Sequence, residues 1–243
     1  MKIEVWSDFV CPFCYIGKRR LEEALSQFPN QDEVEVEFKS FELDPNSPKN
    51  IDKSIHEVLA SKYGMSIEQA KQANQGVGQQ AAGVGLTYHF DTMKPTNTFD
   101  AHRLAKFAKE HGKEAEVTEK LLQAYFTEGK NIGDYETLAD ITASAGLDRQ
   151  QALTALQDQT AFANDVRIDE AIAQQYGISG VPYFVINQKY AISGAQPTET
   201  FLGALQQVWQ EETAAPVVLK DLSTESAADA TCTDGSCGIP EEK

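Results

Sequence analysis

The chain has 243 residues, with 21 Lys and Arg against 37 Asp and Glu, and a formal net charge of −16 at pH 7. Such an acidic surface repels nucleic acid and anionic membranes, so neither is an expected partner. No apolar run reaches the roughly 18 residues that cross a bilayer. Acidic residues stand where an N-terminal leader needs an apolar stretch. We therefore expect a cytoplasmic, globular protein.

The first 45 residues read as strand, helix, strand. Apolar residues alternate with acidic ones over residues 2–7 and again over 33–43, which predicts two strands. Between them, apolar residues at helical spacing predict a helix that starts at Cys11-Pro12-Phe13-Cys14 and ends before Pro29. Two strands joined by a crossover helix lie parallel, with a right-handed connection.

The rest of the chain divides into a helical stretch, a hairpin with a final helix, and a tail. Residues 51–176 are rich in helix formers, and residues 181–187 and 188–194 predict a hairpin that turns at Asn187-Gln188. Residues 197–212 predict a closing helix. The order is βαβ, then helices, then ββα. Residues 214–243 are polar and low in complexity, and we expect a flexible acidic tail.

The two cysteines of the Cys11-Pro12-Phe13-Cys14 motif allow three interpretations. As a structural staple they close a very small loop, which adds little stability. A zinc site needs four nitrogen or sulfur ligands at short spacings. The other candidate ligands are far away or scattered: Cys232, Cys237, His56, His89, His102 and His111. A redox pair is the interpretation that explains the position at a strand-to-helix junction.

The junction gives the two thiols different environments. Cys11 falls at the helix N-terminus, where unpaired N–H groups and the helix dipole favour a thiolate. Pro12 suits the first helical position, because its missing N–H would be unpaired there. Cys14 lies one turn further in. We therefore expect Cys11 to be the nucleophile and Cys14 the resolving thiol.

A second feature is the proline at the start of a buried strand, in "SGVPYFVI" (residues 179–186). In a redox fold of this order, Val181-Pro182 is expected to be a cis peptide that faces the cysteine pair. The Val181 backbone would then be free to pair with an extended substrate. The alternative is an ordinary trans proline that begins a strand.

Three stretches together resemble the DsbA-like family of thioredoxin-fold proteins, and specifically its cytoplasmic FrnE-type branch. They are "SDFVCPFCYIGKRRLE", "NTFDAHRLAKFA" (97–108) and "AQQYGISGVPYFVIN" (173–187). The resemblance implies an α/β fold with a thioredoxin-like core over residues 1–45 and 163–213. It places an all-helical insertion domain over residues 46–162. It also implies thiol–disulfide oxidoreductase activity on protein thiols and disulfides, with no cofactor beyond the redox-active disulfide and glutathione as a candidate thiol partner.

The resemblance also implies the site residues. Cys11 and Cys14 would form the redox pair, and Pro12, Phe13, Val181 and Pro182 would contact substrate. The strong periplasmic oxidant of the family has Pro-His between its cysteines, and Phe13 offers neither a cation nor a donor. We expect a less depressed Cys11 pKa and a potential nearer to about −270 mV than to about −120 mV.

The segment at residues 97–108 starts a helix that overhangs the active site in the resembling family, so Asn97 and His102 are candidates for the substrate cleft. The alternative is that Asn97 or Thr98 caps that helix and that His102 and Arg103 are solvated.

The tail carries a further pair, Cys232 and Cys237, in a C-x4-C arrangement. About 15 flexible residues reach roughly 20 Å, and tethering raises the local thiol concentration into the millimolar range. These cysteines are candidates for an auxiliary redox pair that exchanges electrons with Cys11 and Cys14. The alternative is an inert pair.

Two other functions remain open. Kappa-class glutathione transferases and 2-hydroxychromene-2-carboxylate isomerases resemble the same architecture, but they use one activating Ser or Cys and need no resolving thiol. Cys14 is therefore the residue that favours redox chemistry over a glutathione-dependent isomerase. A redox-regulated holdase would keep binding clients after loss of both thiols.

Overall fold

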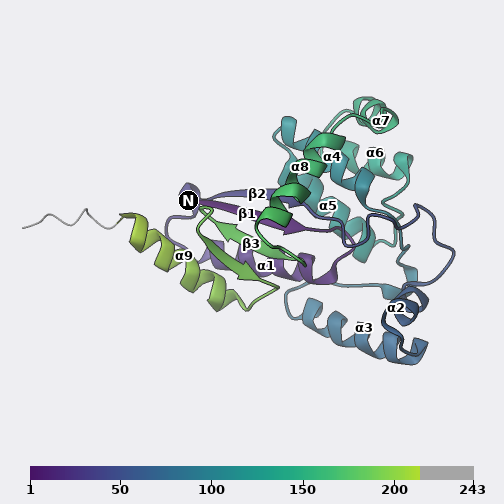
Figure 1. Ribbon diagram of the computed structural model, residues 1–243, viewed down its shortest axis with the longest axis horizontal. Helices are drawn as coiled ribbons and strands as arrows, with labels where there is room; N and C mark the ends of the chain where they lie inside the picture. Colours follow the sequence, from purple (N-terminus) through teal and green to yellow (C-terminus); the bar gives the residue numbers. More distant parts are fainter. Residues whose placement is uncertain (214–243) are drawn as a thin grey trace, which may run out of the picture.

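The computed structural model describes residues 1–213 and contains a four-stranded sheet. The central strand β1 (Lys2–Ser7) pairs in parallel with β2 (Glu35–Ser40) and antiparallel with β3 (Tyr183–Ile186). The edge strand β4 (Tyr190–Ser193) pairs antiparallel with β3, which gives the order β2-β1-β3-β4. Helix α1 (Pro12–Ser26) joins the two parallel strands, and α9 (Thr198–Thr213) closes the fold. The expected βαβ–ββα order of a thioredoxin-like core is confirmed (Figure 1).

The turn between β3 and β4 falls at the predicted residues. Asn187 and Gln188 have φ angles of 50° and 54°, in the left-handed region. Two such residues in succession match the twist of a tight hairpin, and Asn tolerates this region better than most side chains. The Asn187 side chain also accepts a hydrogen bond from the Lys2 N–H at 2.6 Å, which attaches the turn to β1.

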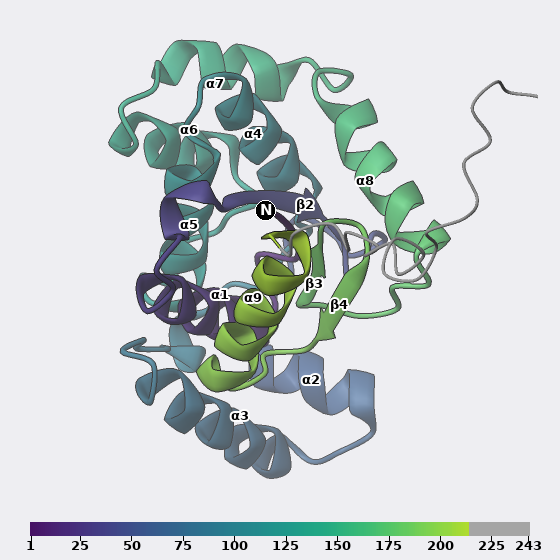
Figure 2. The same ribbon diagram turned by 90° about the vertical axis from the view of Figure 1, so that its left-hand side faces the viewer.

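Seven helices, α2–α8, form a helical block between β2 and β3. Figures 1 and 2 show α2 and α3 on one side of the sheet, and α4, α6 and α7 on the other with α8 alongside. Ser54 and Ser66 begin α2 and α3 with capping boxes, in which each Ser side chain and a later Glu or Gln satisfy free N–H groups. The helix bounds are α2 Ile55–Tyr63, α3 Ile67–Ala82, α4 Phe99–Glu110, α5 Glu114–Phe126, α6 Tyr135–Ser144, α7 Arg149–Gln157 and α8 Ala163–Gln175, with short 3-10 turns at Gln31–Glu33 and Phe90–Thr92.

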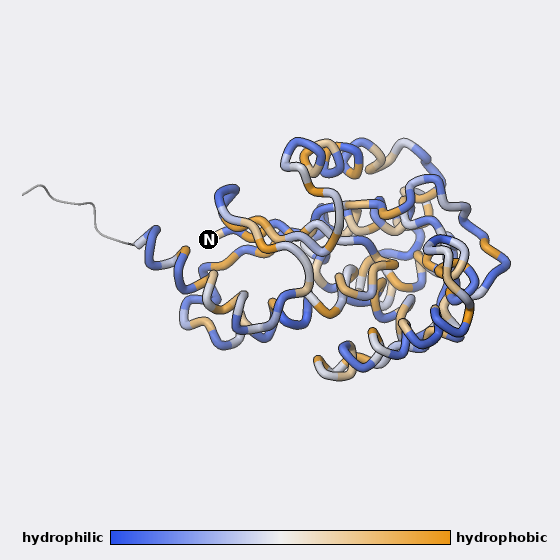
Figure 3. Tube along the Cα trace, turned by 60° about the horizontal axis from the view of Figure 1, so that its bottom comes forward, coloured by the Kyte–Doolittle hydropathy of each residue, from blue (hydrophilic) through white to orange (hydrophobic). Residues whose placement is uncertain are grey.

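Helix α1 is shared by two hydrophobic cores. Its C-terminal half, through Leu21 and Ala24, packs into the core between the sheet and α9. Its N-terminal half, through Tyr15 and Ile16, packs into the core of the helical block. Figure 3 shows hydrophobic segments gathered along the strands and inward helix faces, with hydrophilic segments outward. The start of α1, where both cysteines lie, is therefore held from two sides.

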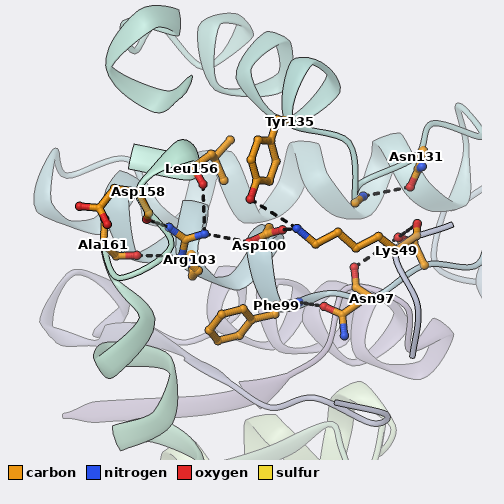
Figure 4. A network of polar contacts seen from close by, with 12 residues as sticks. Lys49, Asn97, Phe99, Asp100, Arg103, Asn131, Tyr135, Leu156, Asp158 and Ala161 are labelled. Carbon is orange, nitrogen blue, oxygen red and sulfur yellow. Dashed lines mark hydrogen bonds and ion pairs between the residues drawn. The ribbon is translucent and has the colours of Figure 1, made fainter. Parts of the chain in front are cut away.

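The α4 residue Arg103 is buried, which corrects the alternative that it is solvated. Its guanidinium donates to the Asp100 carboxylate at 2.8 Å. The same group donates to four carbonyl oxygens at the end of α7 and in the connection to α8 (Figure 4). These carbonyls belong to Ala155, Leu156, Asp158 and Ala161. The carbonyls of Ala155 and Leu156 lie in the last turn of α7, where they have no partner within the helix, so Arg103 supplies their missing donors.

Within residues 1–213, no helix is both long enough and apolar enough to traverse a lipid bilayer.

Candidate active site

The two cysteines stand at the start of α1. Cys11 is the N-cap residue in an extended conformation, and Pro12 is the first helical residue. The Cys14 N–H donates to the Cys11 carbonyl oxygen at 3.0 Å, which closes the first turn. Both side chains are free thiols, 5% and 3% exposed respectively. The structure therefore places the cysteine pair at the N-terminal end of a helix, as the sequence predicted.

The environment of Cys14 suppresses its ionisation. Burial, first, and then the adjacent Cys11 raise the pKa of Cys14 well above its ordinary value. The Ser7 side chain and the Asp8 backbone act in the opposite direction, with smaller effect. Cys14 is thus a protonated thiol at neutral pH, which fits a group that reacts second, after a neighbouring sulfur has been attacked.

The segment before β3 meets the cysteine pair. The Val181-Pro182 peptide bond is cis, and the Cys11 thiol donates to the Val181 carbonyl oxygen at 3.5 Å. Beneath it, a Cβ atom on Gly17 would lie 3.1 Å from Pro182 Cγ, so a glycine there allows α1 to approach this closely.

Two residues that the sequence analysis did not select hold the loop around Cys11. The Asp8 carbonyl accepts from the Cys11 N–H at 3.1 Å, and the Asp8 carboxylate accepts from the Leu43 N–H at 2.8 Å. Tyr88, from the connection after α3, donates its hydroxyl to the Pro12 carbonyl at 2.8 Å. The contacts of the Asp8 carboxylate with Leu43 and of Tyr88 with Pro12 join residues remote in sequence, so no local pattern signals them.

The two candidates from the segment at residues 97–108 do not present their side chains at an open cleft. His102 is buried, and its Nε2 lies 3.3 Å from the Asp8 carboxylate. Asn97 donates to the Pro45 carbonyl at 3.2 Å and accepts from the Phe99 N–H at 2.9 Å, so it caps the start of α4. His102 therefore supports the cysteine loop from beneath, and the interpretation of a solvated His102 is wrong.

The remaining predicted contacts lie at the surface or outside the described residues. Phe13 is exposed on the first turn of α1, and Pro12 and Val181 are half-buried. Within residues 1–213, no cluster of three His, Cys, Asp or Glu side chains could hold a metal ion. Cys232 and Cys237 lie beyond the described residues.

A pair of thiols at the start of a helix, next to a cis proline that precedes a strand, is typical of a thioredoxin-fold protein. The family model described as "DSBA-like thioredoxin domain" matches residues 2–206, and the chain belongs to that family.

The chain is similar to three other proteins. It is 32% identical to the uncharacterized protein YwbO of Bacillus subtilis (strain 168) over 207 residues, 84% of this chain and 94% of that protein. The probable DsbA oxidoreductase SCO1869 of Streptomyces coelicolor has a TM-score of 0.84 at 40% identity and covers 99% of this chain and 100% of its own. The cytosolic disulfide reductase DsbM of Pseudomonas aeruginosa, solved with GSH, has a TM-score of 0.60 at 13% identity over 86% of this chain and 100% of its own, a likeness of fold.

Proposed function

We propose that this protein is a FrnE-type thiol–disulfide oxidoreductase that works in the cytoplasm on protein thiols and disulfides. The observation that carries the proposal is the difference between the two thiols. Cys11 stands at the helix N-cap beside the Val181 carbonyl, whereas Cys14 is a buried thiol with a raised pKa one turn later. An attacking and a resolving thiol need this division of roles.

The exchange proceeds in two steps. The Cys11 thiolate attacks a substrate disulfide, a bond forms between Cys11 Sγ and one substrate sulfur, and the other sulfur leaves and takes up a proton. Cys14 then loses its proton and attacks Cys11 Sγ, which forms the Cys11–Cys14 disulfide and releases the second substrate thiol. The substrate gains two electrons and the pair loses two. A thiol reductant such as glutathione restores the dithiol, and the reverse sequence oxidises substrate thiols.

The substrate would contact the residues around Cys11. Phe13 is exposed and Pro12 is half-buried next to Cys11, and the half-buried Val181 accepts from the Cys11 thiol. Pro182 is buried, so it would shape the site rather than offer an open surface. A substrate carrying a backbone N–H can take the Val181 carbonyl once Cys11 no longer donates to it. Asn97 and His102 act from behind this surface by holding the start of α4 and Asp8.

Cys232 and Cys237 are proposed as an auxiliary pair. Their thiols would attack the Cys11–Cys14 disulfide. The tail pair would then be oxidised to a Cys232–Cys237 disulfide, and Cys11 and Cys14 would be reduced to thiols by two electrons. The double variant Cys232→Ser with Cys237→Ser tests this role. We expect slower reduction of the Cys11–Cys14 disulfide in the variant, and an unchanged rate contradicts the proposal.

The decisive experiment equilibrates the protein in graded glutathione buffers, quenches it by alkylation and measures each cysteine by mass spectrometry. A Cys11–Cys14 disulfide that forms and disappears with one two-electron potential supports the oxidoreductase. If Cys11 and Cys14 stay as separate thiols while glutathione binds without exchange, the glutathione-dependent isomerase replaces it. The matched variant Cys14→Ser should accumulate more mixed disulfide on Cys11 than the wild type, since the neighbouring resolving thiol is absent.

A further inference from the structure

Cys14 must lose its proton before it attacks Cys11 Sγ. Its thiol is buried and stays protonated at neutral pH, so a neighbouring group has to take that proton during the second step. Two residues at the end of β1 form hydrogen bonds with the Cys14 sulfur, the Ser7 side chain and the Asp8 backbone N–H. An N–H group only donates, whereas a hydroxyl both accepts and donates. The proton of Cys14 can therefore leave through Ser7.

A small polar cavity lies next to Ser7, between the sheet and the helical block. Its volume is about 10 Å³, close to the space that one water molecule needs. Figures 1 and 2 show α4 and α5 beside β2. The described residues that line the cavity are Ser7, Phe9, Phe38, Lys39, Ser40, His102, Ala105, Lys106 and Thr118. The Thr118 hydroxyl oxygen is buried and has no hydrogen-bond partner within residues 1–213, so the cavity is suited to hold a water molecule.

Among these lining residues, His102 is the one that can accept and keep a proton at neutral pH. Lys39 and Lys106 are ammonium groups in ion pairs, with Lys39 Nζ 2.8 Å from the Glu37 carboxylate and Lys106 Nζ 2.5 Å from the Asp169 carboxylate. An ammonium group has no acceptor site. Serine and threonine hydroxyls can pass a proton on but do not retain it, whereas a neutral imidazole has one nitrogen that accepts.

Asp8 determines which nitrogen of His102 is the acceptor. The Asp8 carboxylate lies 3.3 Å from Nε2, so Nε2 carries the hydrogen and donates it to this carboxylate. Nδ1 is left as the acceptor. When Nδ1 takes up a proton, the imidazolium stands beside a carboxylate that is 1% exposed, and attraction between the two charges is strong at such a buried position.

We propose that Ser7 and one water molecule in this cavity carry the Cys14 proton to Nδ1 of His102. The Ser7 oxygen takes the proton from Cys14 Sγ while its own proton passes to the water, and the water passes a proton to Nδ1. The Cys14 thiolate then attacks Cys11 Sγ, the Cys11–Cys14 disulfide forms, and the second substrate sulfur leaves and takes up a proton from solvent. His102 releases its proton to solvent, so Ser7, the water and His102 end unchanged. The proposal rests on the oxidoreductase function proposed above and assigns the proton path of its second step.

Charged and titratable groups surround this path on every element packed against it. Carboxylates face His102 from the loop after β1 and from the segment after β2, and the nearby cations are each paired with a carboxylate. These groups are Asp8, Glu42 with its partner Arg167 of α8, and Lys39 and Lys106, both paired with Asp169 of α8, while Cys11 and Tyr88 face Cys14. A test of the path therefore needs a substitution that leaves these pairs in place, and Ser7→Ala is such a substitution.

The test times the two steps separately. Reduced protein reacts once with a peptide whose cysteine is activated as a mixed disulfide with thionitrobenzoate. Thionitrobenzoate leaves first because it is the more acidic thiol, so its release reports the attack by Cys11. Samples are quenched with acid at intervals, and mass spectrometry follows the disappearance of the Cys11–peptide disulfide, which reports the attack by Cys14.

We expect Ser7→Ala and His102→Gln to slow the second step at pH 7 by about tenfold or more. Towards pH 10 hydroxide removes the Cys14 proton directly, so the ratio of the wild-type rate to the variant rate should fall below about threefold. A merely structural defect would keep this ratio constant. The control Thr142→Val removes another fully buried hydroxyl, which donates to the Leu138 carbonyl in α6, and should keep the wild-type rate of both steps.

The variant Ser7→Ala removes a single oxygen atom, so it decides the question even if His102→Gln folds poorly. A second step that is unchanged in Ser7→Ala, or a rate ratio that stays constant from pH 7 to pH 10, overturns the proton path. No release of thionitrobenzoate by the folded wild-type protein overturns the oxidoreductase instead.

Discussion

The Sγ atom of Cys11 lies 3.5 Å from the carbonyl oxygen of Val181, although 170 residues separate the two along the chain. The sheet creates this contact. Trp6 of β1 and Tyr183 of β3 are paired antiparallel, so the residues that follow β1 and those that precede β3 meet at one edge. The register of β1 with β3 therefore brings the loop that contains Cys11 next to the Val181-Pro182 segment.

The raised pKa of Cys14 predicts a pH dependence of stability. Because the folded state holds this proton more tightly than the unfolded chain, the reduced protein keeps its full stability below the ordinary thiol range. As the pH rises from about 8.5 towards 10, its free energy of unfolding should fall by up to about 1.4 kcal/mol per unit. Urea denaturation under reducing conditions between pH 7 and 10 measures this, with Cys14→Ala for comparison. If the free energy of unfolding changes with pH in the same way for the wild type and Cys14→Ala, this prediction is wrong.

The hydrogen bond from Tyr88 to Pro12 predicts a loss of stability in Tyr88→Phe. The substitution keeps the ring, which stacks on Phe126 with centroids 4.6 Å apart, and removes the hydroxyl that meets the Pro12 carbonyl. We expect the free energy of unfolding to drop by about 1 kcal/mol. Tyr63→Phe is the control, since Tyr63 is exposed and has no hydrogen bond to another residue within 1–213. Urea denaturation should give a lower free energy of unfolding for Tyr88→Phe than for Tyr63→Phe. Equal free energies would mean that the hydrogen bond from Tyr88 to Pro12 does not stabilise the fold.

Local patterns predicted the elements and the position of the cysteine pair because both depend on short stretches of sequence. Apolar residues with a period of 2 predicted the strands, and apolar residues with a period of 3.6 predicted the helices. The Cys11-Pro12-Phe13-Cys14 motif predicted where the first helix begins. The supports of the site were not predictable in this way. The Asp8–His102 contact spans 94 residues, and the Tyr88–Pro12 contact spans 76. Each depends on how the helical block packs on α1.

Arg103 illustrates the same limit. A charged residue on an amphipathic helix is ordinarily solvated, and its burial here depends on where α7 ends in space. The carbonyls that it satisfies belong to residues 52 to 58 positions further along the chain. No spacing rule within α4 (residues 99–110) could distinguish it from Lys109 of that helix, whose side chain is 43% exposed.

The buried guanidinium of Arg103 predicts a severe effect of a conservative change. Lysine keeps the charge but cannot reproduce a planar fork that reaches Asp100 and several carbonyls together. We expect Arg103→Lys to lower the free energy of unfolding by about 3 kcal/mol. Arg149→Lys is the matched control, because Arg149 makes its ion pairs at the exposed surface and should change by less than about 0.5 kcal/mol. Thermal or urea denaturation of both proteins would reveal a similar loss if the burial of Arg103 were without consequence.

The close approach of α1 to Pro182 predicts opposite effects of one substitution at two helix positions. A Cβ atom at Gly17 would lie 3.1 Å from both Pro182 Cγ and Phe184 Cζ, whereas one at Gly76 in α3 meets nothing within 4 Å. Alanine should therefore stabilise the protein at Gly76 by about 0.5–1 kcal/mol through helix propensity. At Gly17, crowding of about 1–3 kcal/mol outweighs that gain, and we expect net destabilisation of about 1 kcal/mol.

Gly17→Ala should also slow thiol–disulfide exchange, since Phe184 is fully buried and the displacement falls on Pro182 beside Cys11. The measurement pairs urea denaturation with the rate of thionitrobenzoate release from an activated cysteine peptide for both alanine variants. Gly76→Ala should react at the wild-type rate. If Gly17→Ala is as stable and as fast as Gly76→Ala, then the contact between α1 and Pro182 does not position the site.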